Sequence, residues 1–273
     1  MKKFVHIKDK VKQIFVETVK IHWKAKETRV ASSVSPIEIF CVLFYGKLLD
    51  HNPSEPYWEN RDRFIISKGH GSICFYPIFA DLGYFAKDEL ERVGDKDSFL
   101  GGIPDPVISG YETVNGSLGH GIGVACGIAK ALKTKGKGQK VFVLTGDGEL
   151  CEGSIWEGLM FASHHQLDNI IAIVDNNKIS MLDFTKNIIG EDSWVDKFKA
   201  FGWDVYRVDG HDVENIYDVI SRCKNSGSGK PQVIIADTIK GRMIPGLENH
   251  PLSHVMSINE STFNKIIEEN KYE

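Results

Sequence analysis

The stretch Val141-Phe-Val-Leu-Thr-Gly-Asp-Gly-Glu149 joins a short apolar run to an aspartate between two glycines. The run is apolar at every position from Val141 to Leu144, which is typical of a strand buried on both faces of a parallel sheet. The glycines on either side of Asp147 let the backbone turn sharply and approach a ligand closely. Because open parallel sheets bind ligands beyond the carboxyl ends of their strands, Asp147 is predicted to lie at such a site. Taken alone, the tripeptide is more typical of an ordinary turn.

A second apolar run supplies a partner for this aspartate. The run from Ile170 to Asp175 leads into Asn176-Asn177-Lys178-Ile179, and Asn177 lies 30 positions after Asp147. That spacing fits a helix and a second strand that return to the same edge of the sheet. A carboxylate and an amide oxygen would then converge on one point. Magnesium prefers six oxygen ligands and usually takes some from phosphates, so the pair predicts a metal–diphosphate site.

Apolar runs and the stretches between them extend this pattern along the chain. Strands are predicted at 64–66, 140–145, 169–175, 203–208 and 232–236, with crossover helices at 117–135, 152–166 and 212–224. Strands that alternate with helical stretches of this length are typical of parallel sheets. The predicted fold class is therefore α/β, a doubly wound, mostly parallel sheet with helices on both faces. We expect a single domain over 1–273, with an irregular C-terminal segment at about 241–273.

The amino-terminal part of the chain is predicted to be helical. Apolar residues at helical spacing predict an amphipathic helix over 8–27. A second helix is expected to begin at Ser35, which can cap it, with Pro36 in its first turn. Glu38 stands where a capping box places an acidic residue, and the helix should run to about Leu49.

Composition places the chain among ordinary globular proteins. It has 273 residues, 42% of them apolar and 26% charged, and a net charge of −4 gives no reason to expect a nucleic-acid or membrane partner. No signal peptide is visible, and no stretch approaches the roughly 18 apolar residues of a membrane span. The five cysteines are scattered and never form C-x-x-C. This usage predicts reduced thiols and a cytoplasmic location.

Several short blocks resemble one known family. They are Ser67-Lys-Gly-His-Gly71, Gly116-Ser-Leu-Gly-His-Gly121, Gly146-Asp-Gly-Glu-Leu-Cys-Glu-Gly153, Phe201-Gly-Trp203 and Asp209-Gly-His-Asp212. With the aspartate and asparagine above, they resemble the thiamine diphosphate signature and the N-terminal, diphosphate-binding domain of transketolases. The order and spacing agree from near residue 10 to near residue 255. The resemblance implies the thiamine diphosphate-binding fold, with thiamine diphosphate and Mg²⁺ (or Ca²⁺ or Mn²⁺) as cofactors.

The resemblance also implies roles for particular residues. The metal ligands would be Asp147, Asn177 and the carbonyl of Ile179. The cofactor would be contacted by His70, Gly116, Leu118, Gly148, Glu149, Glu152, Asn177 and His254. The catalytic or substrate-binding side chains would be His70, His254, His120 and Arg29. The acid at position 152 would lie at a subunit interface near the cofactor, whereas His211, His164 and His165 match family positions without known chemistry.

Three parts of the sequence depart from the family pattern. Thr28-Arg29 stands where the family usually has Gly-His, and Gly102-Ile103-Pro104 stands where it usually has Gly-His-Pro. A histidine, His120, replaces a usual glutamine. Both lost histidines normally help to hold hydroxyls of a ketose donor, and such buried polar contacts decide discrimination between substrates. We therefore expect a donor with fewer hydroxyls, or with a differently placed charge that Arg29 reads.

Transketolases of the usual kind carry two further domains, and the second supplies the glutamate that protonates the aminopyrimidine. The resemblance therefore implies that this chain is the N-terminal subunit of a two-chain enzyme. A separate C-terminal subunit would carry the pyrimidine-binding domain, and two copies of each chain would form a heterotetramer. Such an enzyme would transfer a two-carbon ketol or acyl unit from a ketose or 2-oxo acid to an aldehyde.

Two alternatives remain at this point. The α subunit of a 2-oxoacid dehydrogenase shares the aspartate and asparagine site, although the blocks at 67–71 and 116–121 favour transketolase. A catalytically degenerate scaffold or regulatory subunit would keep the fold without the chemistry. A dinucleotide-binding domain is excluded because no G-x-G-x-x-G follows the first strand with an acid about 20 residues later.

Overall fold

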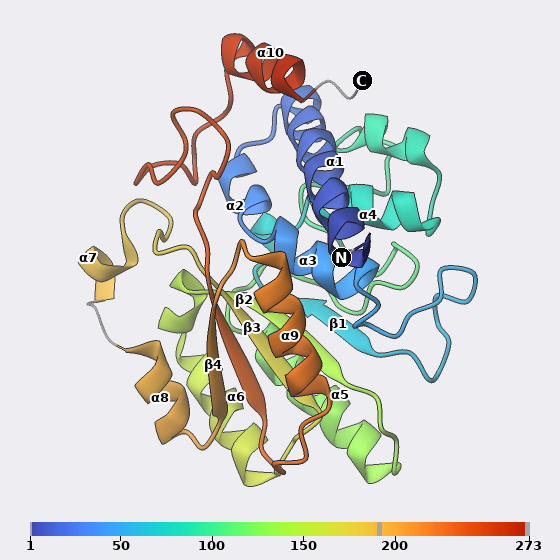
Figure 1. Ribbon diagram of the computed structural model, residues 1–273, viewed down its shortest axis with the longest axis vertical. Helices are drawn as coiled ribbons and strands as arrows, with labels where there is room; N and C mark the ends of the chain where they lie inside the picture. Colours follow the sequence, from blue (N-terminus) through green and yellow to red (C-terminus); the bar gives the residue numbers. More distant parts are fainter. Residues whose placement is uncertain (1, 190–192, 271–273) are drawn as a thin grey trace.

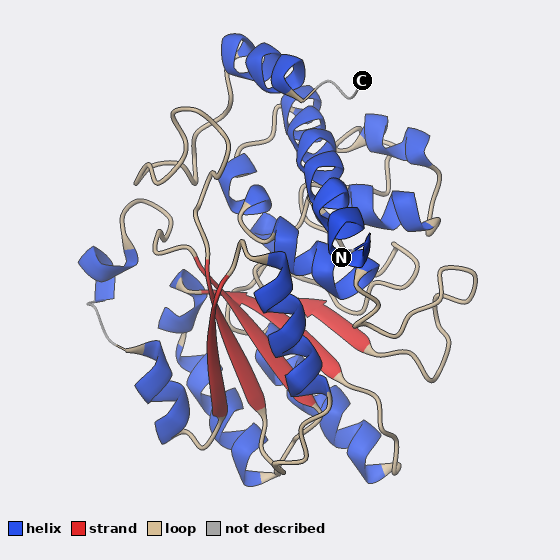
Figure 2. Ribbon diagram, in the orientation of Figure 1, coloured by secondary structure: helices blue, strands red, loops and turns tan. Residues whose placement is uncertain are grey.

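A parallel sheet forms the centre of the computed structural model, which describes residues 2–189 and 193–270. Within these residues the strand order is β1-β2-β3-β5-β4, and all neighbouring strands are parallel (Figure 2). The strands are β1 (Arg63–Ile66), β2 (Val141–Gly146), β3 (Ile170–Asn176), β4 (Asp204–Asp209) and β5 (Gln232–Asp237). The α/β, doubly wound parallel fold predicted from the sequence is confirmed.

Helices cover both faces of the sheet because the strands are apolar on both sides. One core contains Phe142, Leu144 and Ile173 and packs against α1 (Lys2–Ala25), α3 (Ile37–Tyr45), α4 (Phe75–Leu82) and α9 (Val213–Lys224). The other core contains the alternating residues Val143 and Val174. It packs against α5 (Gly121–Thr134), α6 (Gly153–His164) and α8 (Trp194–Ala200). Successive side chains therefore point to opposite cores, as the period of two in a strand requires.

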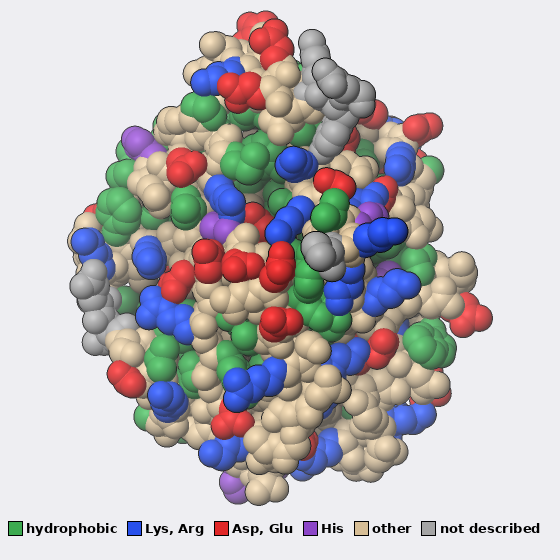
Figure 3. Space-filling view, viewed as in Figure 1, with side chains coloured by type: hydrophobic (Ala, Val, Ile, Leu, Met, Phe, Trp, Pro, Cys, Tyr) green, Lys and Arg blue, Asp and Glu red, His purple; other side chains and the backbone are tan. Residues whose placement is uncertain are grey.

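Shorter elements lie mainly around the carboxyl ends of the strands (Figure 1). They are α2 (Val30–Val34), α7 (Thr185–Ile189) and the 3₁₀ turns η1 (Gly69–Gly71), η2 (Lys87–Arg92) and η3 (Gly148–Cys151). Figure 3 shows that Lys and Arg side chains are interspersed with Asp and Glu over one face of the molecule, with a group of acidic side chains near its centre. In the described part of the chain, no helix has the length and apolarity needed to cross a membrane.

The predicted cap of the second helix is wrong. Ser35 lies between α2 and α3 in a helical conformation, and α3 has no side-chain cap. The Ser35 hydroxyl instead donates to Asp175 Oδ2 at 2.6 Å. Glu38 also does not form a capping box, because its carboxylate accepts from Arg242 at 2.7 Å. Both side chains serve tertiary contacts, which compete with local capping.

The C-terminal segment is irregular only in part. Turns occupy most of 241–259, but α10 (Glu260–Glu269) is a helix, so the expectation of an irregular segment is wrong for those residues. The Asn259 side chain accepts from the amide of Thr262 at 2.8 Å and caps this helix. Phe263 stacks on Trp23 with ring centroids 4.9 Å apart, which places α10 against the end of α1 (Figure 1).

Because β3 lies between two apolar cores, truncating one of its buried side chains should lower the stability of the folded chain. Ile173 is 1% exposed, whereas Ile188 in α7 is 52% exposed. We expect Ile173→Ala to lower the free energy of unfolding by about 2–5 kcal/mol, because it removes transfer free energy and leaves a cavity. The matched deletion Ile188→Ala should stay within about 0.5 kcal/mol of the unchanged chain. Urea denaturation of the three proteins measures both; equal losses would contradict the assignment of β3 to the core.

Candidate functional site

Asp147 lies immediately after β2, buried at the edge where the strands end. Its Oδ2 accepts from the backbone amide of Lys178 at 2.7 Å and from the Thr185 hydroxyl at 3.0 Å. A Cβ added at Gly148 would lie 3.0 Å from Ser180 Oγ, so the turn after β2 closely approaches the loop after β3. The two predicted halves of the site are thus brought together by direct contacts.

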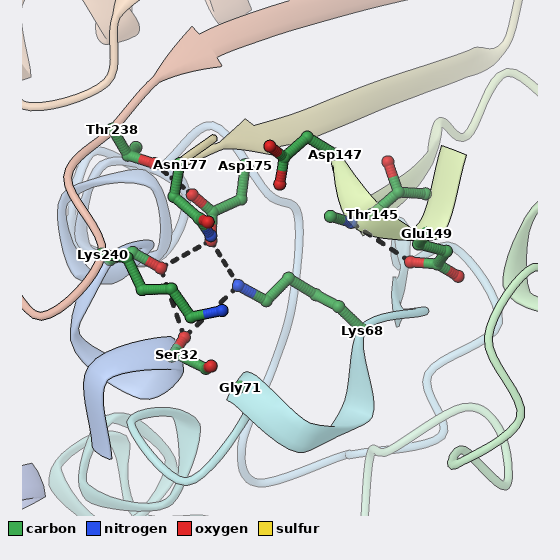
Figure 4. Close-up of polar contacts among 12 residues, drawn as sticks. Ser32, Lys68, Gly71, Thr145, Asp147, Glu149, Asp175, Asn177, Thr238 and Lys240 are labelled. Carbon is green, nitrogen blue, oxygen red and sulfur yellow. Dashed lines mark hydrogen bonds and ion pairs between the residues drawn. The ribbon is translucent and has the colours of Figure 1, made fainter. Parts of the chain in front are cut away.

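Asn177 and Ile179 belong to that second loop. The Asn177 side-chain oxygen accepts from the Ile179 amide at 3.2 Å, and Asn177 is 5% exposed. Lys178 has a φ of 65°, a left-handed conformation that turns the loop back toward Asp147. Figure 4 shows Asp147 and Asn177 at the ends of adjacent strands. The structure therefore places the predicted side-chain oxygens at one edge of the sheet.

This oxygen set fits a hard divalent cation. A carboxylate, an amide oxygen and a backbone carbonyl are the ligand types that magnesium and calcium prefer. The Ile179 carbonyl accepts from the ammonium group of Lys240 at 2.9 Å, so this carbonyl already faces a cationic group. No three His, Cys, Asp or Glu side chains of the described residues cluster as a metal site. A cation here would thus take further oxygens from its ligand.

A buried ion pair lies behind these oxygens. The Lys68 ammonium contacts Asp175 Oδ2, and their side chains are 1% and 0% exposed (Figure 4). Asp175 also accepts from the hydroxyls of Ser35 and Thr238 and, at 3.3 Å, from the Asn177 amide group. Burial alone would raise the pKa of Asp175, but the charge of Lys68 and these donors outweigh it and hold the pKa below its usual value.

Two histidines and a second lysine lie beside this pair. The rings of His70 and His254 have centroids 4.9 Å apart. Nδ1 of His254 lies 3.4 Å from the Lys240 ammonium and 3.3 Å from the Ser32 hydroxyl. The structure thus brings together the two histidines that were predicted from distant parts of the sequence.

Electrostatics keep both histidines neutral. Burial, followed by the charge of Lys68, lowers the pKa of His70 to about 2. Burial, followed by the charge of Lys240, lowers the pKa of His254 to about 4. Burial also lowers the pKa of Lys240 to about 8, and the charge of Lys68 adds to this effect. Neutral rings can donate one hydrogen bond and accept another, which suits them to hold polar groups of a ligand.

Burial has the opposite effect on Asp147. Burial, followed by the negative charge of Asp175, raises the pKa of that carboxyl to about 6. The ionised form is therefore the one that a neighbouring cation would stabilise.

Glu149 fastens the 116–121 loop to the end of β2. Its carboxylate is 2% exposed and accepts from the Ser67 hydroxyl, from the Gly119 amide at 2.8 Å and from the Gly146 amide at 3.2 Å. Gly116 is exposed with a φ of 123°, a conformation that favours glycine. These contacts give Glu149 a structural role that the sequence did not predict.

The other predicted residues lie around this loop. Leu118 is half-buried, and its carbonyl contacts His120 Nδ1 at 3.0 Å. His120 and Glu152 are exposed at the starts of α5 and α6, on either side of Gly119. Their contacts within the described residues do not join them to the histidine pair.

No role was predicted from the sequence for Lys68, Asp175 or Lys240. Lys68 belongs to the block 67–71, and Asp175 ends an apolar run, so a charged residue at a strand end was the available signal. Nothing local marked Lys240. His211 makes a structural contact, because its Nε2 accepts from the Ile239 amide at 2.8 Å.

A cavity of about 600 Å³ opens on the side of α7 and α8. Asp147 and Asn177 line it, together with Phe184, Thr185, Trp194, Arg207 and neighbouring residues. The histidine pair and Lys240 are not among its lining residues.

Comparison with known proteins decides the family. Residues 7–270 match the family model described as transketolase, thiamine diphosphate binding domain. The chain belongs to this family. The structure agrees with the transketolase from Campylobacter jejuni with a TM-score of 0.90 at 30% identity, covering 98% of this chain and 43% of that one.

Relatives of two lengths are found within the family. An apulose-4-phosphate transketolase subunit from Actinobacillus succinogenes is 39% identical, covering 82% of this chain and 80% of that protein. A 6-deoxy-6-sulfo-D-fructose transketolase subunit of a Clostridium species is 34% identical, and the match covers 88% of this chain and 87% of that protein. Human transketolase is 35% identical, but the chain spans only 42% of its length. The chain thus matches most of each subunit-type relative and less than half of the longer enzymes.

The buried pair generates a stability prediction. We expect Lys68→Met to lower the free energy of unfolding by about 3–5 kcal/mol, because it leaves the Asp175 carboxylate buried without its cation. Adding Asp175→Asn in the same chain should recover part of that loss, since the uncompensated charge is then removed. Urea denaturation of the single and double variants measures the coupling. Strictly additive losses would show that the pair does not act as a unit.

Proposed function

We propose that this chain is the diphosphate-binding subunit, a single domain, of a two-chain transketolase-like enzyme. The enzyme would transfer a two-carbon ketol or acyl unit from a ketose or 2-oxo acid donor to an aldehyde acceptor. The observation that supports this most directly is the oxygen set of Asp147, Asn177 and Ile179 beside the histidines and Lys240. Membership of the transketolase family favours this function over that of a 2-oxoacid dehydrogenase subunit, and the intact oxygen set disfavours a degenerate scaffold.

Different residues would bind the metal, the diphosphate and the donor. Asp147, Asn177 and the Ile179 carbonyl would hold Mg²⁺, and the metal would neutralise diphosphate oxygens. Lys240 would transfer its hydrogen bonds from the loop carbonyls to those oxygens. Bound thiamine diphosphate supplies the electron sink for cleavage of the donor's carbon–carbon bond. His70 and His254, held neutral, would orient polar groups of the donor and exchange a proton with them.

The remaining predicted residues would complete the cofactor site. Gly116, Leu118 and Gly148 would approach the cofactor closely, and Glu149 would hold the 116–121 loop in place for them. His120 and Glu152, at the exposed ends of α5 and α6, would face a neighbouring subunit. We place the enzyme in the cytoplasm, consistent with five free cysteines, four of them buried.

A partner chain would cover the exposed side of the site. Apolar side chains next to the site residues are open to solvent: Met181 58%, Leu182 59%, Leu252 44% and Val255 48%. Exposed apolar side chains gathered at one place are typical of an interaction surface. The length match to proteins named as subunits supports the same conclusion. The partner would be a separate C-terminal subunit with the pyrimidine-binding domain, and two copies of each would form a heterotetramer.

Cofactor binding tests the oxygen set. In the complex with the partner, Asp147→Asn should weaken thiamine diphosphate binding by about 100-fold or more, because the metal loses its anionic ligand. Calorimetric titration in Mg²⁺ measures this, and EDTA should abolish binding by the unchanged complex. Asp209→Asn is the matched control. Asp209 also ends a strand, but its carboxylate accepts a hydrogen bond from the His211 amide at 2.9 Å and belongs to no predicted metal site. Equal affinity for all three complexes would refute the assignment.

Complex formation tests the partner surface. We expect Leu182→Glu to raise the dissociation constant for the partner by about 10-fold or more, because a charge would be buried in the interface. Val5→Glu is the control, an equally exposed apolar position (58%) on α1. Biosensor measurements of both variants with the C-terminal subunit would decide. The surface assignment fails if the Leu182 variant binds as tightly as the control.

A further inference from the structure

Arg29 stands in a backbone conformation that most residues avoid. Its φ is 68°, and Lys26, three positions earlier, has a φ of 52°. Left-handed residues other than glycine cost free energy and persist only where the surrounding structure enforces them, which is common at ligand sites. Arg29 is the N-cap of α2, and the amides of Ser32 and Ser33 donate to its carbonyl at 2.9 and 3.1 Å, which ties its backbone to the first turn of that helix. The loop is therefore built to hold position 29 in one orientation.

The guanidinium of Arg29 has N–H donors without a hydrogen-bond acceptor among the described residues. Its side chain is 32% exposed, and its charge partner among the described residues is Glu27, with the nearest N and O atoms 3.6 Å apart. That separation is too long for a hydrogen bond. No hydrogen bond from the Arg29 side chain occurs within residues 2–189 and 193–270. A planar group with five N–H donors is thus left loosely paired and partly open to a ligand.

Contacts join this loop to the histidine pair. A Cβ added at Gly102 would lie 2.9 Å from Glu27 Oε1, and one added at Gly69 would lie 3.1 Å from Ile103 Cγ2. The loop at 101–103 therefore contacts both the loop at 27–29 and the loop at 69–71. Burial is the largest cause of the low pKa of both His70 and His254, and the charge of Arg29 lowers the pKa of each further. Arg29 is therefore close enough to both rings for its charge to influence them.

Ile103 gives this region an apolar side. It also approaches Gly116, where an added Cβ would lie 3.9 Å from Ile103 Cδ1. A donor hydroxyl placed against Ile103 would lose its water hydrogen bonds without gaining a protein partner, which is unfavourable. An oxyanion placed against Arg29 would gain charge-assisted and bidentate hydrogen bonds. The same surroundings therefore disfavour a polyhydroxylated fragment and favour an anionic one.

We propose that Arg29 binds the carboxylate of a 2-oxo acid donor, so that the enzyme takes an acyl unit from a 2-oxo acid in preference to a ketol unit from a ketose. This rests on the proposed function and narrows its donor. The donor's C1–C2 bond breaks and CO₂ leaves. The electron pair of that bond forms the new bond to the aldehyde carbon, and the aldehyde oxygen takes up one proton. The reaction therefore needs no oxidant or reductant.

Turnover of two donors tests the inference. The complex with its partner, thiamine diphosphate and Mg²⁺ is given an aldehyde acceptor with pyruvate or with xylulose 5-phosphate. We expect CO₂ release from pyruvate, with a kcat/KM at least about 10-fold above that for the ketose. Arg29→Gln should lower kcat/KM for pyruvate by about 10- to 100-fold, because a charge-assisted contact is lost. Lys26→Gln, which removes an exposed charge from the same loop, should leave turnover unchanged.

A binding measurement supplies a readout that does not depend on turnover. Methyl acetylphosphonate, a monoester, carries a negative charge like that of a 2-oxo acid. The diester, dimethyl acetylphosphonate, is neutral. In calorimetric titrations, Arg29→Gln should weaken binding of the charged compound by about 10-fold or more and leave that of the neutral ester unchanged. Unchanged thiamine diphosphate affinity shows that the variant is folded.

Three results would overturn the inference. Cleavage of the ketose without CO₂ release from pyruvate refutes it while the proposed function stands. An equal effect of Arg29→Gln on the charged and neutral compounds refutes the carboxylate contact. Failure of the complex to bind thiamine diphosphate refutes the proposed function itself, and the donor assignment with it.

Discussion

The arrangement of the site depends on the buried ion pair between Lys68 and Asp175. Each charge alone would be costly at full burial, so the two groups must stay together in the folded chain. Lys68 follows β1 and Asp175 lies in β3, and Asp175 also accepts hydroxyl hydrogen bonds from the α2–α3 junction and from the residue after β5. One carboxylate thereby fixes the relative positions of four segments. The oxygens of Asp147 and Asn177 lie directly against this support.

The same pair sets the electrostatics of the neighbouring groups. The Lys68 charge helps to keep His70 uncharged and to lower the pKa of Lys240, while the Asp175 charge raises the pKa of Asp147. A buried pair of opposite charges thus produces a region in which the histidines are neutral and the outer carboxylate favours a cation. We propose that specificity for the donor comes from Arg29 and Ile103, which differ from the usual family pattern.

Periodicity predicted the fold well because β2 and β3 are apolar on both faces and end in polar residues. The convergence of Asp147 and Asn177 followed from the topology of parallel strands. Ser35 was assigned wrongly because a local capping pattern cannot reveal a competing tertiary acceptor such as Asp175. Lys240 was missed because its partners lie about 60 residues earlier in the chain, and no local pattern encodes such a contact. The helix at 260–269 was missed although Asn259 offered a cap, because its apolar positions are few.

We propose that thiamine diphosphate is anchored through a divalent cation at the edge formed by Asp147, Asn177 and Ile179. A crystal structure of the two-chain complex with thiamine diphosphate and Mn²⁺, measured at the manganese absorption edge, tests this most directly. We expect one anomalous peak coordinated by oxygens of these three residues and by the diphosphate, with Lys240 turned toward the diphosphate. A diphosphate bound elsewhere, for example in the cavity beside α7 and α8, or a manganese peak away from Asp147, would contradict it.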